Sequence, residues 1–293
     1  MFDIDIRELA KSDGGKYSIE SLDSAYNFCK EITTSHYENF PVASVLIPKS
    51  KRKFIYSVYS FARIADDIAD EIDDKEEKLA LLNNYRDNLS KINLSNPIFF
   101  ALENTIKTIG LSKENFHLLL DAFEQDINFI QPRTWEDNFE YCKKSANPVG
   151  RIILEIFGLK DKELLEYSDM LCTGLQLTNF WQDISVDKLK NRCFIPLSIL
   201  EKYNVKDIYE IDNNEDINKI IDELISITEE KFEFGSQLIS HLKPYRLKLE
   251  IAITLNGGRS VLKKIKQLRF NVLENRAKLY KLDYVDIILK SIF

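Results

Sequence analysis

The sequence contains little glycine, proline or cysteine, and these shortages narrow the class of protein. Nine Gly and seven Pro in 293 residues leave little material for the tight turns of a β-rich fold. The four cysteines are scattered, with no C-x-x-C pair and no histidine at zinc-ligand spacing. This argues against a disulfide framework and a structural zinc site. A helical protein in the reducing cytoplasm is expected.

Long apolar runs and an excess of positive charge are also missing. No run reaches the roughly 18 apolar residues that span a bilayer, and no segment near the N-terminus has the pattern of a signal peptide. The formal net charge of −7 argues against a nucleic-acid partner. A soluble or peripheral protein is therefore expected. Residues 284–293 are apolar enough to lie on a membrane, although packing onto the protein's own core is the simpler interpretation.

Apolar residues recur at intervals of three and four through most of the chain, which predicts about a dozen helices. No stretch is typical of an interdomain linker, so a single domain spanning 1–293 is predicted. The segment 203–218, rich in Asn and Asp, is expected to be exposed and weakly structured. Helix breaks are expected at Phe40-Pro41, Ile47-Pro48, Asn96-Pro97, Ile109-Gly110, Gln131-Pro132, Asn147-Pro148, Phe157-Gly158, Ile195-Pro196 and Lys243-Pro244.

The first of two acidic patterns lies at 59–71, inside a segment with good helical periodicity. At about 100° per residue, Asp66 and Asp70 are one turn apart and point in the same direction, with Asp67 beside them. An intrahelical pair of Arg63 with Asp66 or Asp67 would also orient Arg63 toward a phosphate. A wedge of roughly 60° contains Tyr59, Arg63, Asp66 and Asp70.

The second acidic pattern lies at 176–187 and repeats the geometry of the first. Asp183 and Asp187 are again spaced by one helical turn, and amide side chains precede them on the same face. A wedge of roughly 80° contains Gln176, Asn179, Asp183 and Asp187.

Like charges at this spacing repel each other by a few tenths of a kcal/mol, so a surface helix gains nothing from either pair. Oxygen ligands without nearby His or Cys suit Mg²⁺, which typically joins one or two carboxylates to a substrate phosphate. Either pair alone is explained as well by a solvated acidic face. Both together predict two acidic helices that face each other across a cavity and hold Mg²⁺ and a diphosphate.

At these motifs the sequence resembles the squalene/phytoene synthase family, and within it the bacterial hydroxysqualene synthases of hopanoid biosynthesis. The resemblance covers nearly the whole chain and implies a single-domain, all-α helical bundle of the isoprenoid-synthase type around a central cavity. Asn147-Pro148 and Phe180-Trp181-Gln182 favour that subgroup. The stretches that carry the closer match are 36–44, 141–150, 175–183 and 257–259.

The resemblance also implies roles for individual residues. Tyr141 occupies the position of a tyrosine implicated in cyclopropanation, although a core tyrosine with a satisfied hydroxyl is an alternative. His36 is equally well explained as a hydrogen-bonded helix terminus. The implied catalytic magnesium ligands are Asp66, Asp70, Asp183 and Asp187, with Asp67 and Asn179 close to the metal. The implied substrate-binding residues are His36, Asn39, Arg63, Gln176, Asn179 and Arg192.

Two positions depart from the family pattern. Gln182 stands where an arginine often precedes the aspartate, and Phe194 stands where a tyrosine often follows Arg192. These departures weaken the case for a reaction that joins two prenyl diphosphates. Phe180 and Trp181 are expected to do no more than pack the helix.

The subgroup implies a Mg²⁺-dependent reaction of presqualene diphosphate, or of another long prenyl diphosphate. The diphosphate leaves, the carbocation rearranges, and one water captures it to give hydroxysqualene without NADPH. The alternative is head-to-head condensation of two farnesyl or geranylgeranyl diphosphates to presqualene diphosphate, squalene or phytoene, which Tyr141 keeps open. A third alternative is a non-catalytic relative that keeps the fold as a binding module. Such relatives usually lack some of the four aspartates, and all four are present here. The expected location is the cytoplasm or the inner face of a membrane.

Overall fold

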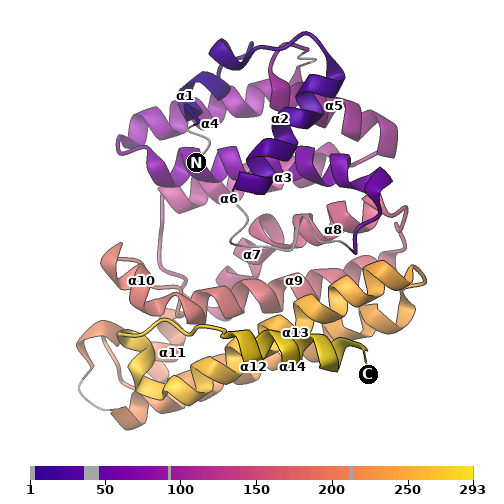
Figure 1. Cartoon of the computed structure of the whole chain (residues 1–293). Helices are drawn as coiled ribbons and strands as arrows, with labels where there is room; N and C mark the ends of the chain where they lie inside the picture. Colours follow the sequence, from indigo (N-terminus) through magenta and orange to yellow (C-terminus); the bar gives the residue numbers. More distant parts are fainter. Residues whose placement is uncertain (1–3, 36–45, 92–93, 212–213, 293) are drawn as a thin grey trace. The chain divides into compact units, whose positions relative to one another are not determined.

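The computed structural model describes residues 4–35, 46–91, 94–211 and 214–292, and every regular element in these ranges is a helix (Figure 1). The all-α prediction is confirmed. Several predicted breaks are helix boundaries: Pro48 precedes α3 (Lys49–Glu71), and Asn96 caps α5 (Pro97–Ile109). That helix ends at Gly110, whose φ of 74° lies in the left-handed region that favours glycine.

Contacts divide the chain into two compact units. The first contains Met1–Asn128 and Arg151–Lys160, and the second contains Phe129–Gly150 and Asp161–Phe293. A single domain spanning 1–293 stays a prediction.

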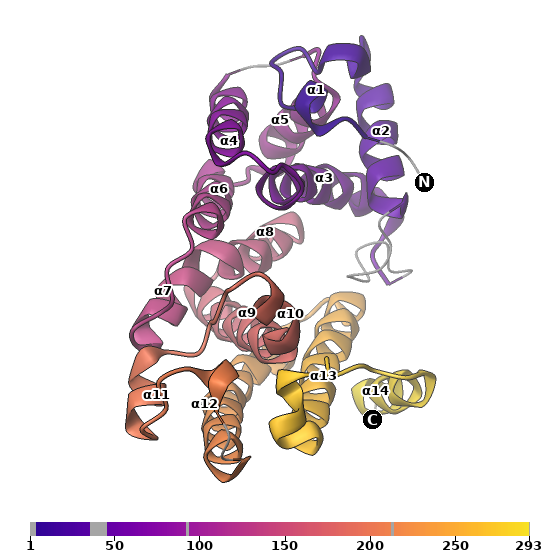
Figure 2. The same cartoon turned by 90° about the vertical axis from the view of Figure 1, so that its left-hand side faces the viewer.

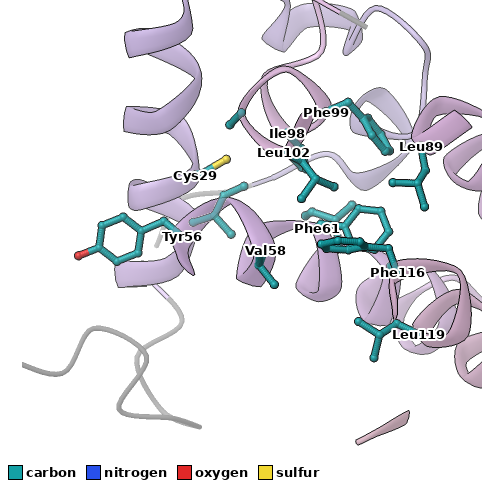
Figure 3. Close-up of a cluster of buried hydrophobic side chains, with 14 of the residues drawn as sticks. Cys29, Tyr56, Val58, Phe61, Leu89, Ile98, Phe99, Leu102, Phe116 and Leu119 are labelled. Carbon is teal, nitrogen blue, oxygen red and sulfur yellow. The ribbon is translucent and has the colours of Figure 1, made fainter. Parts of the chain in front are cut away.

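The first unit has a core in which α3 buries one face against its neighbours. Phe61 is fully buried, and its ring centroid lies 5.1 Å from that of Tyr85 and 5.4 Å from that of Phe116, which Figure 3 shows beside it. This buried face is largely apolar, although it also includes Asp67, which is 5% exposed. Besides α3 and α5, this unit contains the α-helices α1 (Ile6–Leu9), α2 (Leu22–Ser35), α4 (Lys75–Ser90), α6 (Lys113–Ile127) and the end of α8 (Asn147–Ile156).

In the second unit, α9 (Lys162–Gln182), α12 (Asn214–His241) and α13 (Tyr245–Leu268) pack side by side (Figure 2). The fully buried Phe232 of α12 lies against Gly174 of α9 and Gly258 of α13, which have no side chain to hold the helices apart. The other helices of this unit are α7 (Trp135–Ser145), the start of α8, α10 (Ile184–Leu189), α11 (Leu197–Lys202) and α14 (Lys281–Ile292).

The expectation that 203–218 is exposed and weakly structured is wrong in its middle, where Ile208 is only 1% exposed, and at its end. Helix α12 begins at Asn214, so residues 214–218 are helical. Glu215 and Asp216 favour a helix N-terminus through the helix dipole, and the buried Ile217 anchors this first turn. Within the described ranges, no helix combines the length and the apolar character needed to cross a membrane.

Candidate functional site

The first acidic pattern lies on one uninterrupted helix, as predicted, because α3 extends past Asp70 to Glu71. Asp66 is half-buried and Asp70 is exposed, so both carboxylates lie on the accessible side of the helix. Asp67 is different, since it is only 5% exposed and lies against the core of the first unit. The pattern therefore contains one accessible pair and one buried carboxylate.

Arg63 forms the predicted intrahelical ion pair with Asp67, with 2.5 Å between Nη2 and Oδ1. Burial lowers the pKa of Arg63, but the charge and hydrogen bond of Asp67, together with the charge of Asp66, outweigh this effect and the pKa is raised overall. Glu71 lies 3.7 Å from the same Nη2. The buried Arg63 Nε has no hydrogen-bond partner among the described residues, and such donors are usually satisfied by water or a ligand. Asp67 thus fixes the position of Arg63, whose Nε–H group can still donate a hydrogen bond.

The second acidic pattern does not lie on one continuous helix, which corrects the prediction. Helix α9 ends at Gln182, and Asp183, with φ −99° and ψ 10°, lies between α9 and α10. The bend turns Ile184 into the core. The one-turn spacing survives, because the Asp187 N–H still donates to the Asp183 carbonyl at 2.7 Å. The two aspartates are therefore linked by one turn, but Asp187 belongs to the short helix α10.

Arg276 is a part of this site that the sequence did not indicate. Its Nε and Nη2 donate to the two carboxylate oxygens of Asp183 at 2.5 and 3.3 Å. Ala277, which follows Arg276, is also held in place, because the Gln182 side chain donates to its carbonyl at 2.7 Å. Arg276 lies 93 positions after Asp183 in the sequence. Gln182, the residue that departs from the family pattern, thus binds the segment that carries Arg276.

The turn after Asp187 is fixed by Tyr209, which sequence reasoning also missed. The Arg192 N–H donates to the Asp187 carbonyl at 2.9 Å, so Arg192 follows the acidic pair closely. The Tyr209 hydroxyl donates to the Arg192 carbonyl at 2.7 Å and lies 3.3 Å from the Ile184 carbonyl. Burial raises the pKa of Tyr209, so its hydroxyl stays a donor. One side chain thereby joins the start of α10 to the turn that follows it.

Aromatic residues pack next to this turn. Phe180 and Phe194 stack with 3.9 Å between ring centroids and 7° between ring planes. The buried Tyr141 of α7 lies 5.6 Å from Phe180 and 5.8 Å from Phe194. Trp181 is buried and donates to Thr228 at 2.9 Å, so the packing role expected for Phe180 and Trp181 is confirmed. The role of Tyr141 in cyclopropanation stays a prediction.

The other predicted site residues have different outcomes. Gln176 is half-buried and Asn179 is exposed on the last turns of α9, where they precede the acidic pair as expected. His36 and Asn39 lie outside the described residues. The expectation that the two acidic pairs face each other across one cavity concerns both units together and stays a prediction.

The carboxylates of the two acidic patterns are the candidate ligands for Mg²⁺. No three His, Cys, Asp or Glu side chains in the described ranges form a group that holds a metal ion. Each accessible pair offers only carboxylate oxygens, a donor type that suits Mg²⁺, because this ion commonly takes one or two carboxylates and completes its shell with water and substrate phosphate. Asp66, Asp70, Asp183 and Asp187 are more exposed than Asp67 and therefore fit that requirement better. Magnesium binding stays a prediction.

Comparison with known proteins places the chain among prenyl diphosphate enzymes. The family model for squalene/phytoene synthase matches residues 33–283. A hydroxysqualene synthase of Zymomonas mobilis is 40% identical over 168 residues, which are 56% of each chain. One of Rhodopseudomonas palustris is 33% identical over 75% of this chain and 76% of its own. The crystal structure of squalene synthase HpnC from Alicyclobacillus acidocaldarius superposes with a TM-score of 0.78 at 33% identity, covering 85% of this chain and 95% of that one.

Proposed function

Because this chain belongs to the squalene/phytoene synthase family, we propose that it converts presqualene diphosphate into hydroxysqualene in a Mg²⁺-dependent reaction. The similarity to two hydroxysqualene synthases supports this choice of substrate and product. The observation that carries the proposal is the second motif, where two aspartates and two arginines are brought close together. Asp183 is bonded to Arg276, and Asp187 is followed closely by Arg192. Carboxylates suit a metal ion and arginine suits phosphate, so the set matches a metal–diphosphate complex.

The proposed reaction breaks the C–O bond of presqualene diphosphate, and the electron pair leaves with the diphosphate. The carbocation rearranges, a water oxygen bonds to it, and that water loses a proton. The products are hydroxysqualene, inorganic diphosphate and one proton. Bound Mg²⁺ would supply Lewis-acid neutralisation of the leaving group. Arg63, Arg192 and Arg276 would bind the diphosphate oxygens, and preorganised cations at developing charge commonly stabilise a transition state by several kcal/mol.

The carboxylates have two roles in this proposal. Asp66 and Asp70 at the first motif, and Asp183 and Asp187 at the second, would bind Mg²⁺, whereas Asp67 would position Arg63. A carboxylate has about four lone-pair positions, so Asp183 can keep its bonds to Arg276 and still bind a cation. The substrate and product are long isoprenoid lipids, so the proposal includes action in the cytoplasm at the inner face of a membrane.

The alternative is head-to-head condensation of two prenyl diphosphates. The buried Tyr141, beside Phe180 and Phe194, keeps this reaction open. Against it, Phe194 has no hydroxyl at the position where the family often has a tyrosine, and its ring is stacked closely on Phe180. A purely binding role is the weakest candidate, since all four motif aspartates are present.

The test is incubation of the purified protein and Mg²⁺ with presqualene diphosphate or farnesyl diphosphate, each with and without NADPH. Mass spectrometry then identifies the neutral and phosphorylated lipids. We expect hydroxysqualene from presqualene diphosphate, in equal yield with and without NADPH. Consumption of farnesyl diphosphate would instead favour the condensing reaction, and turnover of neither would contradict an enzymatic role on these substrates.

A further inference from the structure

The inner face of α14 is fixed to α13 by specific contacts. Ile287 is only 3% exposed. On either side of it, Asp283 pairs with Lys264 at 3.0 Å, and Ser291 accepts a hydrogen bond from Asn256 at 2.9 Å. These contacts run antiparallel along the two helices, which Figures 1 and 2 both show lying side by side. The side of α14 that packs on the protein is therefore defined.

The opposite side of α14 is apolar and exposed. At about 100° per residue, five aliphatic side chains fall within an arc of roughly 120° centred away from Ile287. Their exposed fractions range from 47% to 83%. A single exposed aliphatic residue is ordinary, but a continuous row marks a surface that binds something. This row, called the outer stripe here, consists of Leu282, Val285, Ile288, Leu289 and Ile292.

The border of the outer stripe combines aromatic and basic side chains. Tyr280 and Tyr284 are exposed, and tyrosine is favoured where one end of the ring is in an apolar medium and the other in water. Lys278 and Lys281 are exposed at the N-terminal end of α14, where their stems can lie along the apolar surface. From 278 to 292 there are three lysines and two aspartates, and both aspartates are paired with lysines. This segment is thus locally positive on a chain of net charge −7.

We propose that α14 lies in the plane of an anionic phospholipid membrane and binds it through the outer stripe. The apolar residues would enter the boundary between headgroups and acyl chains, while the lysines would attract anionic headgroups. A second copy of the chain fits less well, because a stable protein interface uses about 20–30 residues on each side and the outer stripe with its border is much smaller. Membrane binding through this surface does not depend on the proposed reaction.

The test is co-sedimentation of the full chain with vesicles, which requires no substrate. The vesicles contain either phosphatidylcholine alone or phosphatidylcholine mixed with phosphatidylglycerol. The outer-stripe variant carries Leu282→Ser and Leu289→Ser. The matched control carries Leu94→Ser and Ile130→Ser, which are also exposed aliphatic residues. We expect the affinity of the outer-stripe variant for mixed vesicles to fall at least about tenfold, while that of the control stays within about twofold.

Two further measurements separate the proposal from its competitors. Lys278→Gln combined with Lys281→Gln should weaken binding to mixed vesicles but not to phosphatidylcholine alone. Light scattering without vesicles should give the same mass for the wild type and the outer-stripe variant. Equal vesicle binding by these two proteins, or a wild-type dimer that the outer-stripe substitutions dissociate, would overturn the proposal. Vesicle binding without turnover of presqualene diphosphate would contradict the proposed reaction but not the proposed membrane binding by the outer stripe.

Discussion

Two adjacent glycines of α13, Gly257 and Gly258, should respond in opposite ways to alanine. A methyl group at Gly258 would lie 2.7 Å from Phe232 Cζ and 2.9 Å from Leu175 Cδ2, closer than carbon atoms pack. Phe232 cannot withdraw easily, since its Cδ1 and Cε1 also lie close to Gly174. At Gly257, nothing lies within 4 Å of an added methyl group.

The magnitudes follow from two opposing effects. Alanine in place of glycine inside a helix stabilises by about 1 kcal/mol, whereas overpacking a core costs about 1–3 kcal/mol. Gly257→Ala should therefore raise the free energy of unfolding by up to about 1 kcal/mol, and Gly258→Ala should lower it by about 1–2 kcal/mol. Urea denaturation followed by circular dichroism measures both. A change of the same sign in the two variants would refute the close packing of α9, α12 and α13 around Phe232.

The remaining predictions concern the site. Arg276→Met should lower kcat/KM about 100-fold. It should lower the free energy of unfolding by less than about 1 kcal/mol, because the Arg276 side chain is about half exposed. The control Arg269→Met removes a similar surface ion pair and should leave both quantities nearly unchanged. Tyr209→Phe should cost about 1–2 kcal/mol of stability and reduce kcat/KM about tenfold, and full activity would argue against its positioning role. Arg63→Ala should destabilise by about 3–5 kcal/mol, since it removes the cation paired with the buried Asp67 carboxylate; calorimetry showing no loss would contradict that account.

Local sequence features predicted much of the fold. Pro48, Asn96 and Gly110 act on the backbone within one or two residues, so their effects at helix ends are visible in the sequence. The first acidic pattern was predicted correctly for the same reason, because it depends only on the period of one continuous helix. The segment 214–218 was missed, since its polar composition concealed the buried Ile217.

The parts of the site that depend on tertiary structure were not predictable in this way. Arg276 and Tyr209 reach the second motif from distant segments, and no spacing rule connects them with Asp183 or Arg192. The bend at Asp183 was missed because the one-turn hydrogen bond persists through it, so the periodicity of the sequence is unbroken. The need for glycine at 258 depends on Phe232, which lies on another helix.

The central claim is that water captures the carbocation formed from presqualene diphosphate. The most direct test is turnover of presqualene diphosphate with Mg²⁺ in water enriched in a heavy oxygen isotope, followed by mass spectrometry of the neutral lipid. The account predicts hydroxysqualene that contains one heavy oxygen atom from the solvent. An unlabelled alcohol, or a hydrocarbon product with no oxygen, would contradict it.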